Sequence, residues 1–445
     1  MTNFVRYFAL SFIVLATFCI SCADNVIIED ETESADVSTQ TQMSDLSKMV
    51  LTGKDDYRKI FYIQTVNRNS MAKRDLGSVQ VIKDVDNFIP EYEEMKIAGI
   101  CDDYLVIQAG NFNYFSDDDE SKNSYALMVY DINSFDVKKP LFQKEFVGFP
   151  GTAFYTIGNN IYIGCKNAVR LAKIEKNNIT VSNIHDLGVL QKLKTIDVFG
   201  RMGNYLLAID DVIHPYYAFL FDIHDLDNPV YVKTLDLPTD INIHYEDAAC
   251  KGNMAYVLAS YGHMGGYGNH IFGLKYENGK LRNKFAYSAG KSSTTIEDNS
   301  FDGHFFPNLN DLFIYGDKLF TTGSGGILIL NRNPELKKSS NSKENTFYSE
   351  LNESYLNAPY AKDNQVKLFK FEKGFITSIA VIGIKIYAIS REYYNPPEIY
   401  DFDEDKYDIK SVKLLELRYD SETESFREIK SVEVDKHISQ IYINK

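Results

Sequence analysis

The chain has 445 residues, of which 44% are hydrophobic and 13% aromatic, so it can bury a large apolar core. Its formal net charge at pH 7 is −15, and the sequence contains no basic patch of the kind that nucleic-acid binding requires. Nucleic acid is therefore excluded as a partner, and the acidic balance mainly indicates solubility.

The first 21 residues predict a signal peptide that is removed from the mature protein. Arg6 supplies the positive charge, and residues 7–18 form an apolar run shorter than the ~20 residues that cross a bilayer. The end of this segment resembles the lipobox of bacterial lipoproteins, although Cys19 stands where that motif usually has Leu. The resemblance implies that Cys22 is lipidated; an ordinary signal peptide cut nearby is the alternative.

Residues 22–56 predict a flexible tether, because they are polar and acidic and show no sustained hydrophobic period. An acidic cluster close behind Cys22 consists of Glu29, Asp30, Glu31 and Glu33. It resembles the surface-export signal of Bacteroidetes lipoproteins, while a simple solvated linker accounts for the same residues. The resemblance implies an extracytoplasmic protein, lipid-anchored to the outer membrane on its periplasmic side or at the cell surface.

A repeated phrase organises the remaining residues, 57–445. It consists of an apolar strand, a tight turn such as Gly-Asn and a second apolar strand, and residues 156–174 show it most clearly. Alternating apolar residues around such a turn are the strongest short-range signal for a β-hairpin. The phrase occurs near Ile97, Thr156, Phe199, Cys250, Ile314 and Val381. A phrase that returns at this interval indicates a repeat architecture, so we predict an all-β propeller of four-stranded blades.

The number of blades follows from the two ends of the repeat region. Six complete units are expected to start near residues 95, 152, 195, 247, 311 and 376. Residues 57–93 supply a further unit that lacks its first strand, and residues 437–445 form one alternating strand without a unit of its own. We predict that this last strand completes the N-terminal blade and closes a seven-bladed ring without exposed edges. Six or eight blades are the alternatives.

Two units carry a further motif after their third strand. Near Tyr130 and Phe221 the strand ends in Asp-Ile, a polar turn follows, and Pro opens the next strand. With the Gly-Asn turns, this resembles the LVIVD-repeat family of bacterial β-propellers, although the fifth and sixth units lack the Asp-Pro element. The resemblance implies a propeller and an extracytoplasmic lipoprotein, and it transfers no catalytic residue. WD, kelch, Asp-box and quinoprotein propellers do not fit, because their motifs use Trp and this chain has none.

The longer connections between strands predict where a partner binds. In such blades the loops between the second and third strands, and those between blades, lie on one face. Nearly all long segments are assigned to this face: residues 110–123, 210–216, 238–246, 260–270, 287–310, 348–364 and 391–410. Binding residues gather on loops that a rigid scaffold holds, so this long-loop face is the predicted binding face. Its candidate residues are His214, Tyr216, His244, His263, His270, Asp302, His304, Tyr393 and Tyr394.

The residue types on this face allow more than one ligand. Imidazoles together with Asp302 or Glu246 would suit a transition metal, but their spacing fixes no ligand geometry. The acidic run that begins at Asp401 departs from a calcium loop, since Lys406 replaces the turn Gly and Val412 replaces the bidentate Glu. No cofactor is therefore assigned, and a divalent metal is kept only as an alternative. The tyrosines would suit sugar or peptide.

The remaining motifs favour binding over catalysis. The sequence contains no nucleophile elbow, P-loop or dinucleotide fingerprint. Cys101, Cys165 and Cys250 are odd in number and lie among apolar residues, so we expect buried free thiols. The sequence thus predicts a non-catalytic module that binds a protein or glycan. The alternative is a propeller enzyme, a hydrolase or lyase that acts on polysaccharide.

Overall fold

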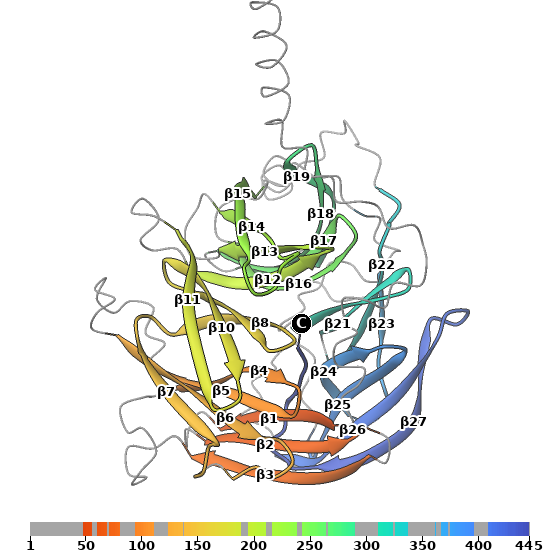
Figure 1. Cartoon of the computed structure of the whole chain (residues 1–445). Coiled ribbons are helices and arrows are strands. Elements are labelled where there is room, and N and C mark those ends of the chain that lie inside the picture. Colours follow the sequence, from red (N-terminus) through yellow and green to blue (C-terminus); the bar gives the residue numbers. More distant parts are fainter. Residues whose placement is uncertain are drawn as a thin grey trace, which may run out of the picture.

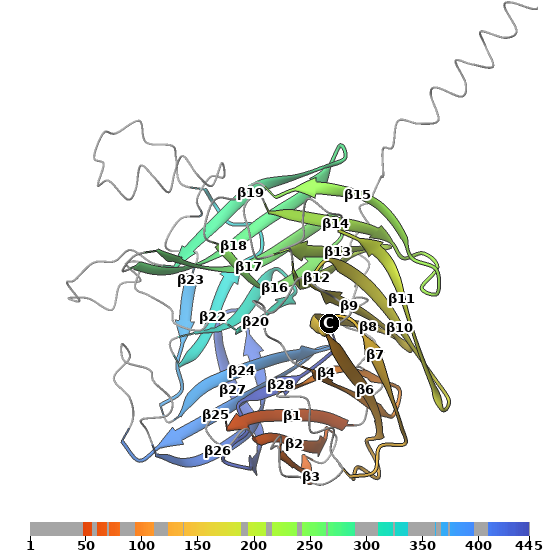
Figure 2. The same ribbon diagram turned by 90° about the vertical axis from the view of Figure 1, so that its left-hand side faces the viewer.

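Seven four-stranded antiparallel sheets surround the C-terminal residues, as Figures 1 and 2 show. This computed structural model describes residues 48–55, 60–68, 71–80, 94–110, 123–136, 138–187, 195–210, 216–237, 243–263, 266–289, 310–323, 325–336, 361, 366–372, 374–395 and 408–444. These described ranges contain strands and turns but no α-helix. The prediction of an all-β, seven-bladed propeller is confirmed.

We number the blades 1 to 7 and letter their strands A to D from the centre outward. Blade 1 consists of β28 (Gln440–Tyr442), β1 (Lys48–Asp55), β2 (Ile60–Asn67) and β3 (Ala72–Gln80). Blade 2 consists of β4 (Glu94–Cys101), β5 (Tyr104–Gly110), β6 (Ser124–Asp131) and β7 (Phe142–Val147). Blade 3 consists of β8 (Gly151–Ile157), β9 (Asn160–Cys165), β10 (Ala168–Glu175) and β11 (Asn178–Asp186). Blade 4 consists of β12 (Ile196–Met202), β13 (Tyr205–Asp210), β14 (Tyr217–Asp222) and β15 (Val230–Asp236).

The last three blades follow the same A-to-D order. Blade 5 consists of β16 (Ile243–Lys251), β17 (Met254–His263), β18 (Gly266–Glu277) and β19 (Lys280–Ala289). Blade 6 consists of β20 (Asn310–Tyr315), β21 (Lys318–Gly323), β22 (Gly326–Asn331) and β23 (Val366–Phe369). Blade 7 consists of β24 (Phe375–Ile382), β25 (Lys385–Tyr393), β26 (Ile409–Asp420) and β27 (Ser425–Val434).

The C-terminal strand closes the ring, as predicted. Strand β28 pairs with β1, with Val50 opposite Tyr442 and Thr52 opposite Gln440. The internal order of blade 1 differs from the prediction, because residues 48–55, assigned to the tether, form its second strand. Met49, Val50 and Leu51 in that strand are all buried. Their apolar run is short and consecutive, so it lacks the alternation that marks a half-exposed strand.

The strands of each blade are connected by tight turns on one face. In blades 2 to 7 the A and B strands are separated by two residues only, for example residues 158–159. The first residue of each turn has a positive φ angle: Asp102, Gly158, Gly203, Gly252, Gly316 and Gly383. Such two-residue turns match the twist of paired strands and favour Gly. We call this side, which also carries the C–D connections, the short-turn face.

Two of the predicted long segments lie differently in the structure. Residues 260–270 form no long loop, because β17 and β18 remain paired from Ser260 with Asn269 out to His263 with Gly266. Residues 348–364 belong to the C–D connection of blade 6, since β22 ends at Asn331 and β23 begins at Val366. That connection starts from the short-turn face, and not from the long-loop face.

Buried polar side chains fasten neighbouring blades to each other. The Gln108 amide of blade 2 bonds both the N–H and the carbonyl of Gly151 in blade 3, at 2.8 and 3.0 Å. The Asn444 amide forms the same pair of bonds with the backbone of Ile100. A side-chain amide that bonds both groups of one residue imitates a strand partner, so it extends the hydrogen bonding from one sheet to the next.

An aromatic cluster holds blades 6 and 7 together. Phe320 in β21 is fully buried, and its ring lies 5.5 Å from Tyr315, 5.0 Å from Tyr419 and 5.2 Å from Phe426. The contacts with Tyr419 and Phe426 are edge-on, which is a favoured arrangement of aromatic rings. Beside the cluster, Lys318 of blade 6 pairs with Glu424 of blade 7 at 2.7 Å.

Candidate functional site

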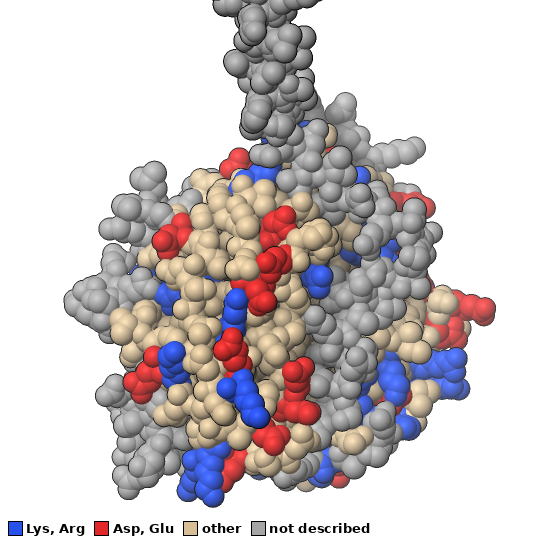
Figure 3. All heavy atoms as spheres, viewed as in Figure 1, with Lys and Arg blue, Asp and Glu red and all other residues tan. Residues whose placement is uncertain are grey.

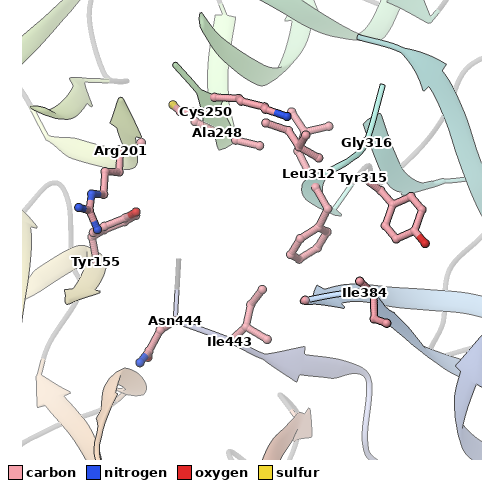
Figure 4. Close-up of a pocket in the computed structure, with 16 residues that line it drawn as sticks. Tyr155, Arg201, Ala248, Cys250, Leu312, Tyr315, Gly316, Ile384, Ile443 and Asn444 are labelled. Atoms are coloured by element: carbon pink, nitrogen blue, oxygen red, sulfur yellow. The ribbon is translucent and has the colours of Figure 1, made fainter. Parts of the chain in front are cut away.

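A cavity of about 290 Å³ lies at the centre of the ring, where the A strands lead into the short turns (Figure 4). Six of the seven blades line it: Ile443 and Asn444 from blade 1, Tyr155 from blade 3, Gly200 and Arg201 from blade 4, Ala248 to Lys251 from blade 5, Leu312 to Gly316 from blade 6, and Gly383 and Ile384 from blade 7. The cavity therefore forms only when the ring is complete.

The wall of this central cavity has a polar side and an apolar side. Figure 4 shows Tyr155 and Arg201 next to each other on one side, with Leu312 and Ile384 across from them. Arg201 Nε donates a hydrogen bond to the carbonyl of Gly203 at 2.9 Å, which anchors the guanidinium beside its own turn. The arrangement suits a ligand with one charged or polar end and one apolar end.

Tyr155 and Cys250 keep their protons in this environment. Burial raises the pKa of the Tyr155 phenol above its usual range, and Arg201 opposes that shift only in part. Burial also raises the pKa of the Cys250 thiol, with a smaller contribution from Asp247. The tyrosine is thus a neutral hydrogen-bonding group, and the thiol is a packed side chain and not a nucleophile. Cys101, Cys165 and Cys250 are all buried and free, which confirms the expectation from the sequence.

The residues predicted on the long-loop face are found in different surroundings. His244 at the start of β16 and Tyr394 after β25 are exposed, the latter with 67% of its surface accessible. Tyr216, His270 and Tyr393 are buried. For His263 only the backbone, in β17, is described. The other predicted residues, Cys22, His214, Asp302 and His304, lie outside the described residues.

The three buried residues pack in the framework beneath this face. The ring of Tyr216 meets Tyr245 edge-on at 5.7 Å, and the ring of Tyr393 meets Phe375 at 5.6 Å. His270 stacks near Phe272, and burial lowers its pKa to about 4, so the imidazole is neutral at pH 7. Of the five predicted residues whose side chains are described, His244 and Tyr394 are the two that a partner can reach.

The central cavity was not predicted from the sequence, although the repeat contains a signal for it. When the A strands are aligned on the turn glycine, Arg201 falls where the others have Thr156, Cys250, Ile314 or Val381. At the next position, directly before the turn glycine, blade 5 has Lys251, whereas the other four of these blades have uncharged residues: Ile157, Met202, Tyr315 and Ile382. A cation that replaces an uncharged residue at an inner strand marks a departure from the repeat, and such departures point to function.

The described residues lack two further kinds of site. They contain no group of three or more His, Cys, Asp or Glu side chains placed to hold a metal ion. They also contain no helix that is long and apolar enough to span a membrane. On the face seen in Figure 3, the described Lys and Arg side chains are interspersed with Asp and Glu.

Comparisons with known proteins find solved structures of similar fold but no family. No protein-family model matches the chain, and no curated protein matches its sequence. A solved structure of a proposed 6-phosphogluconolactonase from Bacteroides fragilis is 13% identical, with 89% of this chain and 97% of that chain covered and a TM-score of 0.46. A second one, from Bacteroides uniformis, is 11% identical, with 89% and 99% covered and a TM-score of 0.45. A Lactobacillus plantarum protein is 10% identical, with 89% and 98% covered and a TM-score of 0.46. Likeness at this level concerns the fold and carries no argument about activity.

Proposed function

We propose that this chain is a lipid-anchored, extracytoplasmic β-propeller that binds a protein or glycan on its long-loop face and catalyses no reaction. One observation carries the proposal, namely that the A–B connections on the short-turn face are short whereas two connections on the long-loop face are long. Every A–B connection of blades 2 to 7 has two residues, whereas β19 and β20 are separated by residues 290–309 and β25 and β26 by residues 394–408. The long-loop face therefore carries two long segments outside the sheets, while the C–D connection of blade 6, residues 332–365, leaves from the short-turn face.

The framework under that face is rigid enough to hold a binding surface. Arg170 is buried, and its guanidinium donates to the carbonyl of Phe149 at 2.8 Å and to Asn183 Oδ1 at 3.1 Å. Arg391, also buried, donates to the carbonyl of Ile438. Phe149 and Ile438 lie in the short connections between β7 and β8 and between β27 and β28, which both belong to the long-loop face. A frame held by such buried hydrogen bonds suits a binding surface.

The proposed location rests on the N-terminal sequence and on its resemblance to lipoproteins and LVIVD-repeat propellers. Strand β1 begins at Lys48, so residues 23–47 connect Cys22 to the ring. Fully extended, a segment of this length spans at most about 85 Å. A tether of that reach places the ring outside the lipid headgroups and leaves the long-loop face accessible to a partner.

Replacement of Cys22 by Ala is expected to move the protein from the detergent phase to the aqueous phase in a Triton X-114 partition. The physical reason is that each buried CH₂ of an acyl chain contributes ~0.8 kcal/mol to membrane binding, and this variant carries no acyl chain. Cys19→Ala is the matched control, since it changes the neighbouring cysteine and leaves Cys22 intact. Equal partitioning of the Cys22 variant and the wild type would contradict the lipid anchor.

The binding face is tested with His244 and Tyr394, the two predicted residues whose described side chains are exposed. We expect the double variant His244→Ala and Tyr394→Ala to keep the wild-type melting temperature, because exposed substitutions change stability by less than ~0.5 kcal/mol. Capture of a partner, measured by glycan array and by pull-down from an outer-membrane fraction, is expected to fall about tenfold or more.

A matched control for this experiment lies on the opposite face. His224 is exposed in the C–D connection of blade 4, so His224→Ala makes the same chemical change away from the proposed surface. Equal capture by the double variant and the wild type would rule out these two residues as part of the binding surface. Turnover of a polysaccharide by the purified protein would instead support the hydrolase or lyase.

A further inference from the structure

We propose that the central cavity on the short-turn face is a second binding site, which takes a small carboxylate with an apolar body. The site is separate from the long-loop face, and it does not depend on the partner proposed there. Three observations carry the inference: the charge of the cavity wall, the chemistry of its polar side and the departure of its residues from the repeat.

The cavity wall is positively charged although the chain is acidic. The formal net charge of the protein is −15, yet Arg201 and Lys251 line the cavity and its described lining residues include no Asp or Glu. Asp247 lies on strand β16 with Lys251. Its carboxylate accepts hydrogen bonds from the backbone N–H groups of Ala248 and Leu312 at 2.8 and 2.5 Å. Its charge is therefore engaged within the framework, and an anion that enters the cavity meets two cations.

The polar side of the cavity offers the donors that a carboxylate accepts. A guanidinium presents its N–H groups in a planar fork that fits two carboxylate oxygens, and charged hydrogen bonds of this kind are strong. The bond from Arg201 to Gly203 uses Nε, so it does not occupy the two terminal nitrogens of the guanidinium. The Tyr155 phenol lies beside it and is protonated, so its O–H adds a third donor.

On the apolar side of the cavity, an apolar residue replaces a polar residue of the repeat. Ile384 is the second residue of the blade 7 turn, and 83% of its surface is exposed. The same position in the other five A–B turns is polar: Asp103, Asn159, Asn204, Asn253 and Asp317. Cations thus replace uncharged residues, and an isoleucine replaces Asn or Asp, around one cavity. Exceptions of two kinds, the cations Arg201 and Lys251 and the apolar Ile384, therefore meet at one cavity and indicate a ligand with a charged end and an apolar end.

The volume limits the size of this ligand. At ~30 Å³ for each water-sized group, 290 Å³ holds on the order of ten non-hydrogen atoms or small groups. This lies at the low end of the range for small-molecule pockets, ~300–1,000 Å³. A branched aliphatic acid or the C-terminal residue of a peptide that ends in Leu or Ile fits these limits. Both sources offer the same chemistry, namely a carboxylate next to an apolar side chain.

Isothermal titration calorimetry on the purified protein, lacking residues 1–22 and so free of detergent, tests the site. The probes are 4-methylpentanoate, its neutral amide, the dipeptide Ala-Leu with a free or an amidated C-terminus, and inorganic phosphate. We expect the acid to bind and the amide to bind at least about tenfold more weakly. Binding of the free dipeptide but not of the amidated one would identify a peptide C-terminus as a source of the carboxylate.

Variants separate the cavity from the general charge of the protein. Arg201→Gln is expected to weaken binding of 4-methylpentanoate at least about tenfold, and Lys251→Gln by a smaller factor because that side chain is exposed. Ile384→Asn restores the polar residue of the other turns and is expected to weaken binding several-fold. Lys176→Gln is the matched control, since Lys176 is exposed on the same face outside the cavity and is expected to leave binding unchanged.

Several results would overturn this inference. They are the absence of binding of 4-methylpentanoate and Ala-Leu to the wild type, equal binding of acid and amide, binding of phosphate alone, and equal weakening by Lys176→Gln and Lys251→Gln. Melting curves for each variant show whether it is folded. Should Arg201→Gln fail to fold, the exposed Lys251 and Ile384 variants still decide the question. Capture of a partner on the long-loop face is expected to be unchanged in all of these variants.

Discussion

Deletion of residues 437–445 is expected to lower the free energy of unfolding by at least about 5 kcal/mol. The deleted segment contains Ile438, Ile441 and Ile443, which are 0%, 4% and 9% exposed. Burial of each such side chain contributes ~1.5–3 kcal/mol. The deletion also removes the partner of β1 and the carbonyl acceptor of Arg391 at Ile438. Since domains are stable by only ~5–15 kcal/mol, the truncated protein should melt far below the wild type or aggregate.

A pair of single substitutions controls this deletion. Ile441→Ala removes a buried side chain of β28 and should cost ~2–5 kcal/mol, whereas Ile429→Ala in β27 affects a side chain that is 43% exposed and should cost much less. Differential scanning calorimetry and urea unfolding give both values. A truncated protein with the melting temperature of the wild type would mean that the C-terminal strand does not close the ring.

Phe320→Ala is expected to lower the free energy of unfolding by ~3–5 kcal/mol, the cost of a large cavity in a packed core. Phe320 is fully buried, and its ring lies against Tyr315, Tyr419 and Phe426 at the junction of blades 6 and 7. The midpoint of urea unfolding measures the loss. Because the junction joins two blades, the loss should appear in the global transition and not as the separate unfolding of one sheet.

Two variants serve as controls for Phe320→Ala. Phe320→Leu keeps most of the buried volume and should cost clearly less than Phe320→Ala. Tyr394→Ala removes an aromatic ring that is 67% exposed, and it should change stability by less than ~0.5 kcal/mol. A loss below ~1 kcal/mol in Phe320→Ala would show that the aromatic cluster contributes little to the union of blades 6 and 7.

Most of the fold could be predicted because each repeat is marked by short sequence patterns that do not depend on distant residues. Each tight turn and its flanking apolar runs report a hairpin without information from distant residues, and so all seven blades could be counted. The closing strand could be predicted because an unmatched strand at one end complemented an incomplete blade at the other.

The errors in the predicted strands and loops arose where the composition of a segment favours another structure than the one it adopts. Strand β1 follows an acidic polar segment, and its buried run of Met49, Val50 and Leu51 is too short to stand out. Residues 260–270 contain four glycines, which favour a loop, but strand pairing tolerates them and the hairpin continues to His263. The segment 348–364 was assigned to the wrong face because its length, and not its place between β22 and β23, was considered.

The candidate sites were harder to predict, because residue type does not report burial. His270 and Tyr393 were chosen as residue types that bind ligands, yet both are buried in the framework. Conversely, Tyr155, Arg201 and Ile384 belong to three different blades, and only the closed ring brings them around one cavity. The departures of Arg201 and Ile384 from the repeat were visible in the sequence, but their meaning required the positions of the strands in space.

The pairing of β28 with β1 also determines the order of events while the protein is being made. Val50 and Tyr442 are opposite each other in the sheet, and 392 positions separate them along the chain, since 442 less 50 is 392. At a synthesis rate of ~5–20 residues per second, Tyr442 follows Val50 after roughly 20 to 80 s. During that interval β1 has no partner on its inner side and exposes an unpaired edge. A chain that is interrupted before β28 cannot close the ring in this way, so ring closure waits until residues 440–442 have been made.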